Sequence, residues 1–233
     1  MPKTKVSNCI PIFTVALSIF ILASLTLFLI IPTSRFAGNF PYTAPLVGML
    51  YVTTCILGIC AVFYPTQCQR TLAFKKDHKA PGDQTLLLKA VQLKGHHPDC
   101  SEFEANRIVI GKTVLCAACS GLLVGAIVAL AGAFLYFFMG YNFLWADPKV
   151  LVAGNVGMIL GLLQFRFSKY SKLVVNAFFV ICSLLILVIT DMLSKSLLLD
   201  LYAFCSIAFL LTTRIVLSDW NNKKTCIDCG LCV

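Results

Sequence analysis

The sequence carries little charge for its length. Of its 233 residues, 12% are charged and 59% are hydrophobic, and the mean hydropathy is +0.88. Soluble domains contain about 25% charged residues, so this composition excludes an ordinary soluble globular protein. The apolar residues instead form long runs, and about 20 of them in succession suffice for a helix to cross the hydrocarbon core of a membrane. The composition therefore indicates an integral membrane protein.

Common signatures of catalysis are also missing. The sequence contains no nucleophile elbow, no Gly-rich phosphate-binding loop and no HExxH motif. Its only two glutamates are Glu102 and Glu104. One of them would be a general base if it stood beside a zinc-bound water, but loop carboxylates are more commonly solvated. These absences favour a protein that is not an enzyme.

Six apolar runs predict six membrane-spanning helices. The runs are Ile10–Ile31, Leu46–Tyr64, Val114–Met139, Val150–Phe165, Leu173–Leu193 and Ser196–Leu217. They are continuous, whereas the strands of a membrane barrel alternate in polarity over about ten residues. We therefore predict an all-α, polytopic helical membrane protein. Its parts are two first spans (1–64), a loop (65–113), a four-span bundle (114–217) and a Cys-rich tail (218–233).

Basic residues gather on one side of this predicted topology. Sixteen of the 19 Lys and Arg residues fall on the side of the termini, against three, Arg35, Lys149 and Lys195, on the other. Basic loops remain cytoplasmic, so we predict a cell-membrane protein with both termini in the cytoplasm. The net charge of +9 then reflects topology and contact with membrane lipid. Nucleic acid is not an expected partner.

The loop after the second span contains a predicted interfacial helix. In PGDQTLLLKAVQLKG, Asp83 is a candidate N-cap, Leu86, Ala90 and Leu93 share one face, and Gly95 can end the helix in a left-handed turn. Such a helix would anchor the loop to the inner membrane surface.

A group of histidines and cysteines follows this helix. His96, His97 and Cys100 precede Cys116 and Cys119, and RIVIGKT between them resembles a hairpin that reverses at Gly111-Lys112. Nitrogen and sulfur donors at this spacing can supply the four ligands of a tetrahedral zinc site. Cytosolic thiols stay reduced, and the start of a helix favours thiolates, which supports metal binding. The alternatives are iron in place of zinc and packing of small residues at a helix interface.

The pattern HHPDC...F...IG...CAACSGLLVG resembles the uncharacterised multi-pass membrane proteins grouped as domain of unknown function 2085. The matching positions are His96, His97, Cys100, Phe103, Gly111, Cys116, Cys119, Gly121 and Gly125. Many members carry Arg between the two cysteines, where this chain has Ala117 and Ala118. The resemblance implies a multi-helix membrane fold with a metal-binding turn, and it supplies no activity.

Three more cysteines stand in the tail. Cys226, Cys229 and Cys232 resemble the start of a bacterial-type ferredoxin motif. A 4Fe-4S cluster would need a fourth ligand, for which Cys9, Cys68 and Cys100 are candidates on the same side. The alternatives are a zinc site, shared with the loop or separate, and reactive thiols in a disordered tail.

The sequence thus favours a zinc-stabilised structural module, or one that docks a cytoplasmic or membrane protein partner. A membrane redox protein carrying an iron-sulfur cluster is an alternative. A transporter or a zinc-dependent membrane enzyme is another, since polar residues lie within the spans. These are Asn155, Gln164, Asn176, Asp191, Asp200 and Arg214.

Overall fold

The chain forms an all-α membrane bundle in a computed structural model, which describes residues 9–30, 42–63, 93–94, 97–98, 101–110, 113–141 and 147–228. The helices of the bundle are α1 (Cys9–Ile30), α2 (Thr43–Phe63), α5 (Ala117–Ala133), α6 (Pro148–Leu162), α7 (Lys169–Ser194) and α8 (Leu197–Asp228). A π-helical turn, η2 (Phe134–Phe138), extends α5. The predicted class and the six helices are confirmed.

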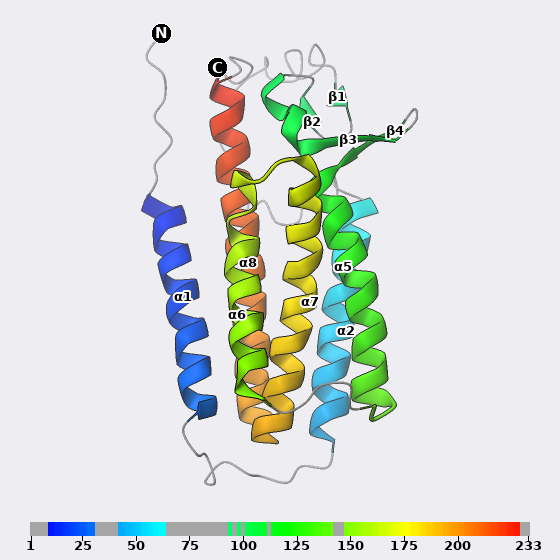
Figure 1. The fold of residues 1–233 in the computed structure, drawn as a ribbon, viewed down its shortest axis with the longest axis vertical. Coiled ribbons are helices and arrows are strands. Elements are labelled where there is room, and N and C mark those ends of the chain that lie inside the picture. Colours follow the sequence, from blue (N-terminus) through cyan, green and yellow to red (C-terminus); the bar gives the residue numbers. More distant parts are fainter. Residues whose placement is uncertain are drawn as a thin grey trace, which may run out of the picture.

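The helices run alternately up and down (Figure 1). Five are long and apolar enough to cross a membrane, whereas α6 has 15 residues. α6 nevertheless joins the end of the bundle where α5 finishes to the end where α7 begins (Figure 1), and a 3-10 turn at Gln164–Arg166 (η3) follows it. Its start is well defined, because Pro148 is in the first turn and Asp147 Oδ1 accepts a 2.8 Å hydrogen bond from the Lys149 amide.

Short strands mark one end of the bundle, which we call the hairpin end (Figure 1). β1 (Leu93–Lys94) pairs antiparallel with β2 (His97–Pro98), and β3 (Arg107–Ile110) pairs antiparallel with β4 (Thr113–Cys116). A 3-10 helix, η1 (Ser101–Asn106), lies between the two hairpins.

The β3–β4 pairing confirms the reversal predicted at Gly111-Lys112. Two boundaries differ from the prediction. Leu93 and Lys94 lie in a strand rather than in the predicted interfacial helix, whose other residues lie outside the described part of the chain. The third span begins at Ala117, because Val114–Cys116 pair with β3.

α7 lies at the centre of the bundle and packs closely against α5 and α6. Side chains fully buried on it include Ile186, Leu187 and Ile189. Glycines on its neighbours allow the close approach: a Cβ at Gly125 of α5 would lie 2.6 Å from the Ala177 carbonyl oxygen, and one at Gly161 of α6 would lie 2.7 Å from Phe179 Cβ. The predicted helix contact at Gly157 and Gly161 is confirmed, and its partner is α7.

Polar side chains connect α1 to the bundle. Ser18 Oγ donates a 3.1 Å hydrogen bond to Thr213 Oγ1 of α8. Ser24 Oγ lies 2.6 Å from the Tyr202 hydroxyl. These bonds hold a helix whose outer face carries exposed apolar residues.

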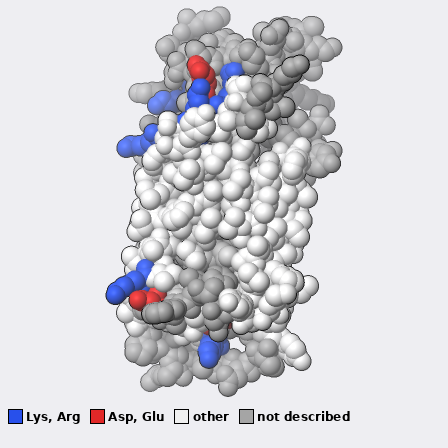
Figure 2. Space-filling model, turned by 45° about the vertical axis from the view of Figure 1, so that its right-hand side comes forward, with Lys and Arg blue, Asp and Glu red and all other residues white. Residues whose placement is uncertain are grey.

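A belt without charged side chains crosses the face seen in Figure 2, and charged side chains lie above and below it. Arg107, Arg166, Lys169, Lys172, Lys223 and Lys224 belong to the hairpin end, whereas Lys149 and Lys195 stand at the opposite end. The unequal distribution of basic residues therefore persists among the described residues.

α8 continues beyond the predicted span. It extends from Leu197 to Asp228 over 32 residues, so the first part of the predicted tail is helical. Lys223 Nζ lies 2.7 Å from Asp219 Oδ2 one turn away on the exposed side of this extension.

Candidate functional site

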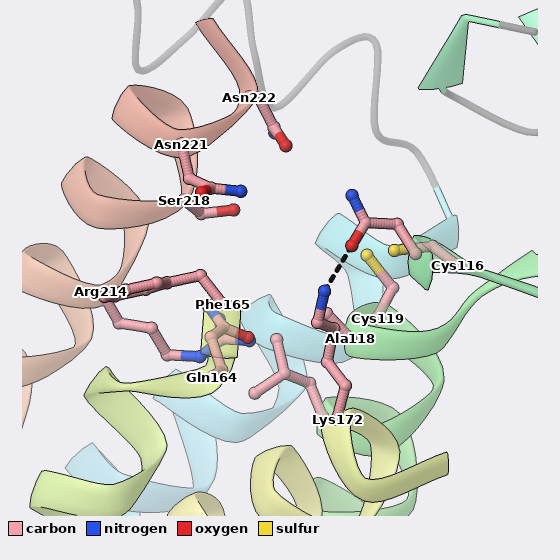
Figure 3. A pocket seen from close by; sticks show the side chains of 12 residues that line it. Cys116, Ala118, Cys119, Gln164, Phe165, Lys172, Arg214, Ser218, Asn221 and Asn222 are labelled. Atoms are coloured by element: carbon pink, nitrogen blue, oxygen red, sulfur yellow. Dashed lines mark hydrogen bonds between the residues drawn. The ribbon is translucent and has the colours of Figure 1, made fainter. Parts of the chain in front are cut away.

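Cys116 and Cys119 meet at the junction of β4 and α5. Cys116 is the last residue of the strand and the N-cap of the helix, with extended backbone angles of φ −76° and ψ 123°. Cys119 lies in the first helical turn, so a spacing of three residues brings the sulfurs together. They are in hydrogen-bond contact and lie close to each other in Figure 3. The predicted Cys-x2-Cys pair at the start of a helix is confirmed.

Two buried cations lie beside this pair. Lys172 of α7 is 6% exposed and Arg214 of α8 is 5% exposed. Lys172 Nζ donates a hydrogen bond to Asn106 Oδ1, drawn as the dashed line in Figure 3. Two consecutive helices thus contribute positive charge to one place.

Arg214 is held by neutral groups. Its Nε donates a 3.0 Å hydrogen bond to Asn176 Oδ1, and its Nη2 donates a 3.0 Å bond to Gln164 Oε1. Nη2 also bonds to Asn176 Oδ1, and the guanidinium lies 5.8 Å from the ring centroid of Phe179. None of these partners carries a negative charge.

A cavity of about 100 Å³ connects the thiols with the cations. Its polar lining consists of Asn106, Cys116, Cys119, Gln164, Lys172, Arg214, Ser218, Asn221 and Asn222, and its apolar lining of Ala118, Leu122 and Phe165. The described lining contains no carboxylate. A volume of this size holds about three water molecules, at about 30 Å³ each, or one ion.

The surroundings act on the sulfurs in two opposite ways, because the cations attract a thiolate whereas burial and the charge of Cys116 disfavour one on Cys119. Buried cations are costly unless an opposite charge offsets them. Arg214 is near enough to interact electrostatically with Cys116 and Cys119, and Lys172 with Cys116. A thiolate on Cys116 would offset part of the charge of the two cations, and a bound metal ion would be needed to hold both sulfurs deprotonated.

Contacts from η1 hold the strands against α7. Glu104 Oε1 accepts a 3.0 Å hydrogen bond from Lys169 Nζ. This bond and the positive charge of Lys169 lower the pKa of the Glu104 carboxyl. Phe103 is 2% exposed, so the segment is held by an apolar contact as well as by polar ones. The strand that ends at Cys116 is thereby fixed relative to the two cations.

The other predicted site residues are described only in part. His97 lies in β2 and Cys226 in α8, but their side chains fall outside the described residues. His96, Cys100, Cys229 and Cys232 also fall outside them. Among the described residues, no group of three or more His, Cys, Asp or Glu side chains is arranged to hold a metal.

Sequence reasoning missed the importance of Lys172, which it assigned to membrane topology alone. Asn106 also went unnoticed. Arg214, Gln164 and Asn176 stood out as polar residues within spans, but their spacing along the chain did not reveal that they bond to one another. The available signal was an arginine inside an apolar run, since such residues usually face a partner in the bundle interior.

Comparisons with protein-family models, curated proteins and solved structures found no match.

Proposed function

We propose that this membrane protein holds a zinc ion at the cytoplasmic face, and that the site stabilises a module for docking a protein partner. The observation that carries the proposal is the pairing of the Cys116 and Cys119 thiols beside Lys172 and Arg214, whose hydrogen-bond partners are neutral. Deprotonated sulfur is the form that binds metal. The two cations support that form, and a bound metal ion would offset the repulsion between the two thiolates.

His96 or His97 and Cys100 complete the proposed site. Zinc in structural sites takes four ligands, and three thiolates with one imidazole are a common set. Such a site carries a net charge of about −1, since three thiolates outweigh the charge of Zn²⁺. Lys172 and Arg214 would offset that charge. The donor set and the cations beside it therefore suit the metal.

The proposed role is structural rather than catalytic. A metal that joins the segment around His97 to the start of α5 would rigidify the hairpin end. The described basic residues lie mainly at this end, which supports the cytoplasmic assignment. A partner that docks there would meet a positively charged surface.

Metal analysis of protein purified without added metal tests the proposal. We expect about one zinc per chain, and loss of that zinc in Cys116→Ala and Cys119→Ala. Cys60→Ala is the matched control, because Cys60 is an exposed thiol within α2. Unchanged zinc in both site variants would exclude this pair as ligands. Iron together with acid-labile sulfide, in place of zinc, would instead support the iron-sulfur alternative, in which Cys226, Cys229 and Cys232 bind the cluster.

A second candidate function is thiol–disulfide exchange by the same pair. It is favoured because a Cys-x2-Cys pair at a helix start, beside cations, is the setting of a reactive thiolate. A disulfide-bonded acceptor would take two electrons and two protons from Cys116 and Cys119, which would become a disulfide. Incubation of metal-free protein with oxidised glutathione, followed by maleimide labelling, tests this. Reversible protection of two thiols in the wild type, absent from Cys119→Ala, would support exchange.

A further inference from the structure

A second polar group lies at the end of the bundle opposite the hairpin end. Asp191 is in the last turn of α7, and Asp200 is in the first turn of α8. The link between these helices is short, and Lys195 adopts a left-handed conformation there, with φ 46°. The tight turn brings the two carboxyl groups from neighbouring helices to one place.

The two carboxyl groups differ in their surroundings. Asp200 is 0% exposed, whereas Asp191 is partly exposed. The hydroxyl of Tyr136 donates a 2.7 Å hydrogen bond to Asp191 Oδ2. Asp191 therefore has both a donor and access to the surface.

No donor from the described residues bonds to either carboxyl oxygen of Asp200. The group in hydrogen-bond contact with it is the carboxyl of Asp191. Ionised carboxylates only accept hydrogen bonds, so two of them cannot bond to each other. A bond between them requires a proton on one of the two. Two touching carboxylates without that proton would repel strongly in a buried place.

We propose that Asp191 and Asp200 form a proton-binding site in which one exchangeable proton is shared between the two carboxyl groups. The proton enters from water through Asp191, and it returns to water by the same route. With the proton bound, the pair carries one negative charge, which the Tyr136 hydroxyl stabilises through its bond to Asp191. This site is separate from the thiol cavity and goes beyond the proposed metal site.

The neighbouring elements contribute few other charges. Neither α1 nor α2 contains an acidic or basic residue. Tyr136 is the titratable group that faces the pair from η2. Lys149 of α6 and Lys195 in the link are exposed at this end. The described structure therefore provides no buried cation that would allow both carboxylates to be ionised.

Infrared spectroscopy of the whole protein in lipid nanodiscs tests the proposal directly. At about pH 7, ordinary aspartates, whose pKa is about 3.9, are ionised and show no carboxylic-acid C=O band. We expect such a band in the wild type, with a shift in D2O that reports an exchangeable proton. We also expect Asp191→Asn and Asp200→Asn each to remove or displace it. Asp219→Asn is the control, since Asp219 is exposed on α8, and should leave the band unchanged.

The wild-type measurement is decisive even if a variant does not fold. Absence of the carboxylic-acid band from the wild type would overturn the proposal. A wild-type band that persists unchanged in folded Asp200→Asn would also overturn it. Tyr136→Phe provides a milder test, because loss of its hydrogen bond should change the frequency of the band without removing it. If calcium chloride eliminates the band and raises the melting temperature in the wild type but not in Asp200→Asn, the pair is a cation site instead.

Discussion

The guanidinium Nε of Arg214 donates a 3.0 Å hydrogen bond to Oδ1 of Asn176, which joins α8 to α7 inside the bundle. The side-chain Nδ2 of Asn176 in turn donates a 2.6 Å hydrogen bond to the backbone carbonyl oxygen of Lys172. The acceptor is 0% exposed and the cation is 5% exposed. A full positive charge thus depends on a neutral amide for much of its solvation.

Replacement of this amide should destabilise the protein. Hydrogen bonds to charged groups contribute about 1.5–3 kcal/mol, so we expect Asn176→Ala to lower the free energy of unfolding by about that amount. Asn155→Ala is the control, because the Asn155 amide donates to Thr26 Oγ1 at 2.7 Å in a neutral pair. Neutral bonds between membrane helices contribute about 0.6 kcal/mol on average. Unfolding in dodecyl sulfate measures both. Equal losses would contradict the role given to the charge.

The contact between α5 and α7 should be sensitive to a single methyl group. A Cβ at Gly121 would fall on the backbone carbonyl of Leu173, so we expect Gly121→Ala to destabilise by about 1–3 kcal/mol. Gly58→Ala is the matched control, since a Cβ there has no neighbour among the described atoms within 4 Å. That variant should be neutral, or more stable by up to about 1 kcal/mol. The same unfolding assay reports both changes, and a tolerated Gly121→Ala would show that the helices separate easily.

Removal of the charge of Lys172 should slow the reaction of the thiols. In metal-free protein at neutral pH, iodoacetamide reacts with the thiolate form, which nearby cations favour. We expect iodoacetamide to alkylate Cys116 about fivefold more slowly in Lys172→Gln than in the wild type, which corresponds to about 1 kcal/mol of lost attraction. Lys149→Gln is the control, because Lys149 is exposed at the opposite end of the bundle, and mass spectrometry of the labelled peptides gives the rates. Equal rates in all three proteins would argue against thiolate stabilisation by Lys172.

The contact between Glu104 and Lys169 should weaken in acid. Lys169 lowers the pKa of the Glu104 carboxyl in the folded protein. The stabilisation is therefore present above the unfolded value of about 4.3, and it is lost as the pH falls through the lower folded value. We expect amide exchange in Arg107–Ile110 to be faster in Glu104→Gln than in the wild type at neutral pH. The difference should vanish in acid, and a difference that persists there would contradict the ion pair as its cause.

The span order and the paired cysteines could be read from the sequence because they depend on local patterns. Apolar runs give helix positions, and a spacing of three residues brings Cys116 and Cys119 together once a helix begins. The end of α8 was underestimated, because polarity after Leu217 suggested a tail. A helix that leaves a membrane can continue in water when polar residues cover it, as they do along Ser218–Asp228. α5 also begins three residues later than the predicted span, at Ala117 rather than Val114, because pairing with β3 competes with helix formation.

The sequence by itself determined the all-α class, the unequal distribution of basic residues and the Cys-x2-Cys motif at the start of a helix, since each follows from composition or short-range spacing. Only the tertiary structure decided that Lys172 and Arg214 line one cavity with those thiols, and that Asp200 touches Asp191. The physical reason is that helical periodicity shows which residues share a face of one helix. It does not show which helices pack together, and both groups of residues are assembled by packing between helices.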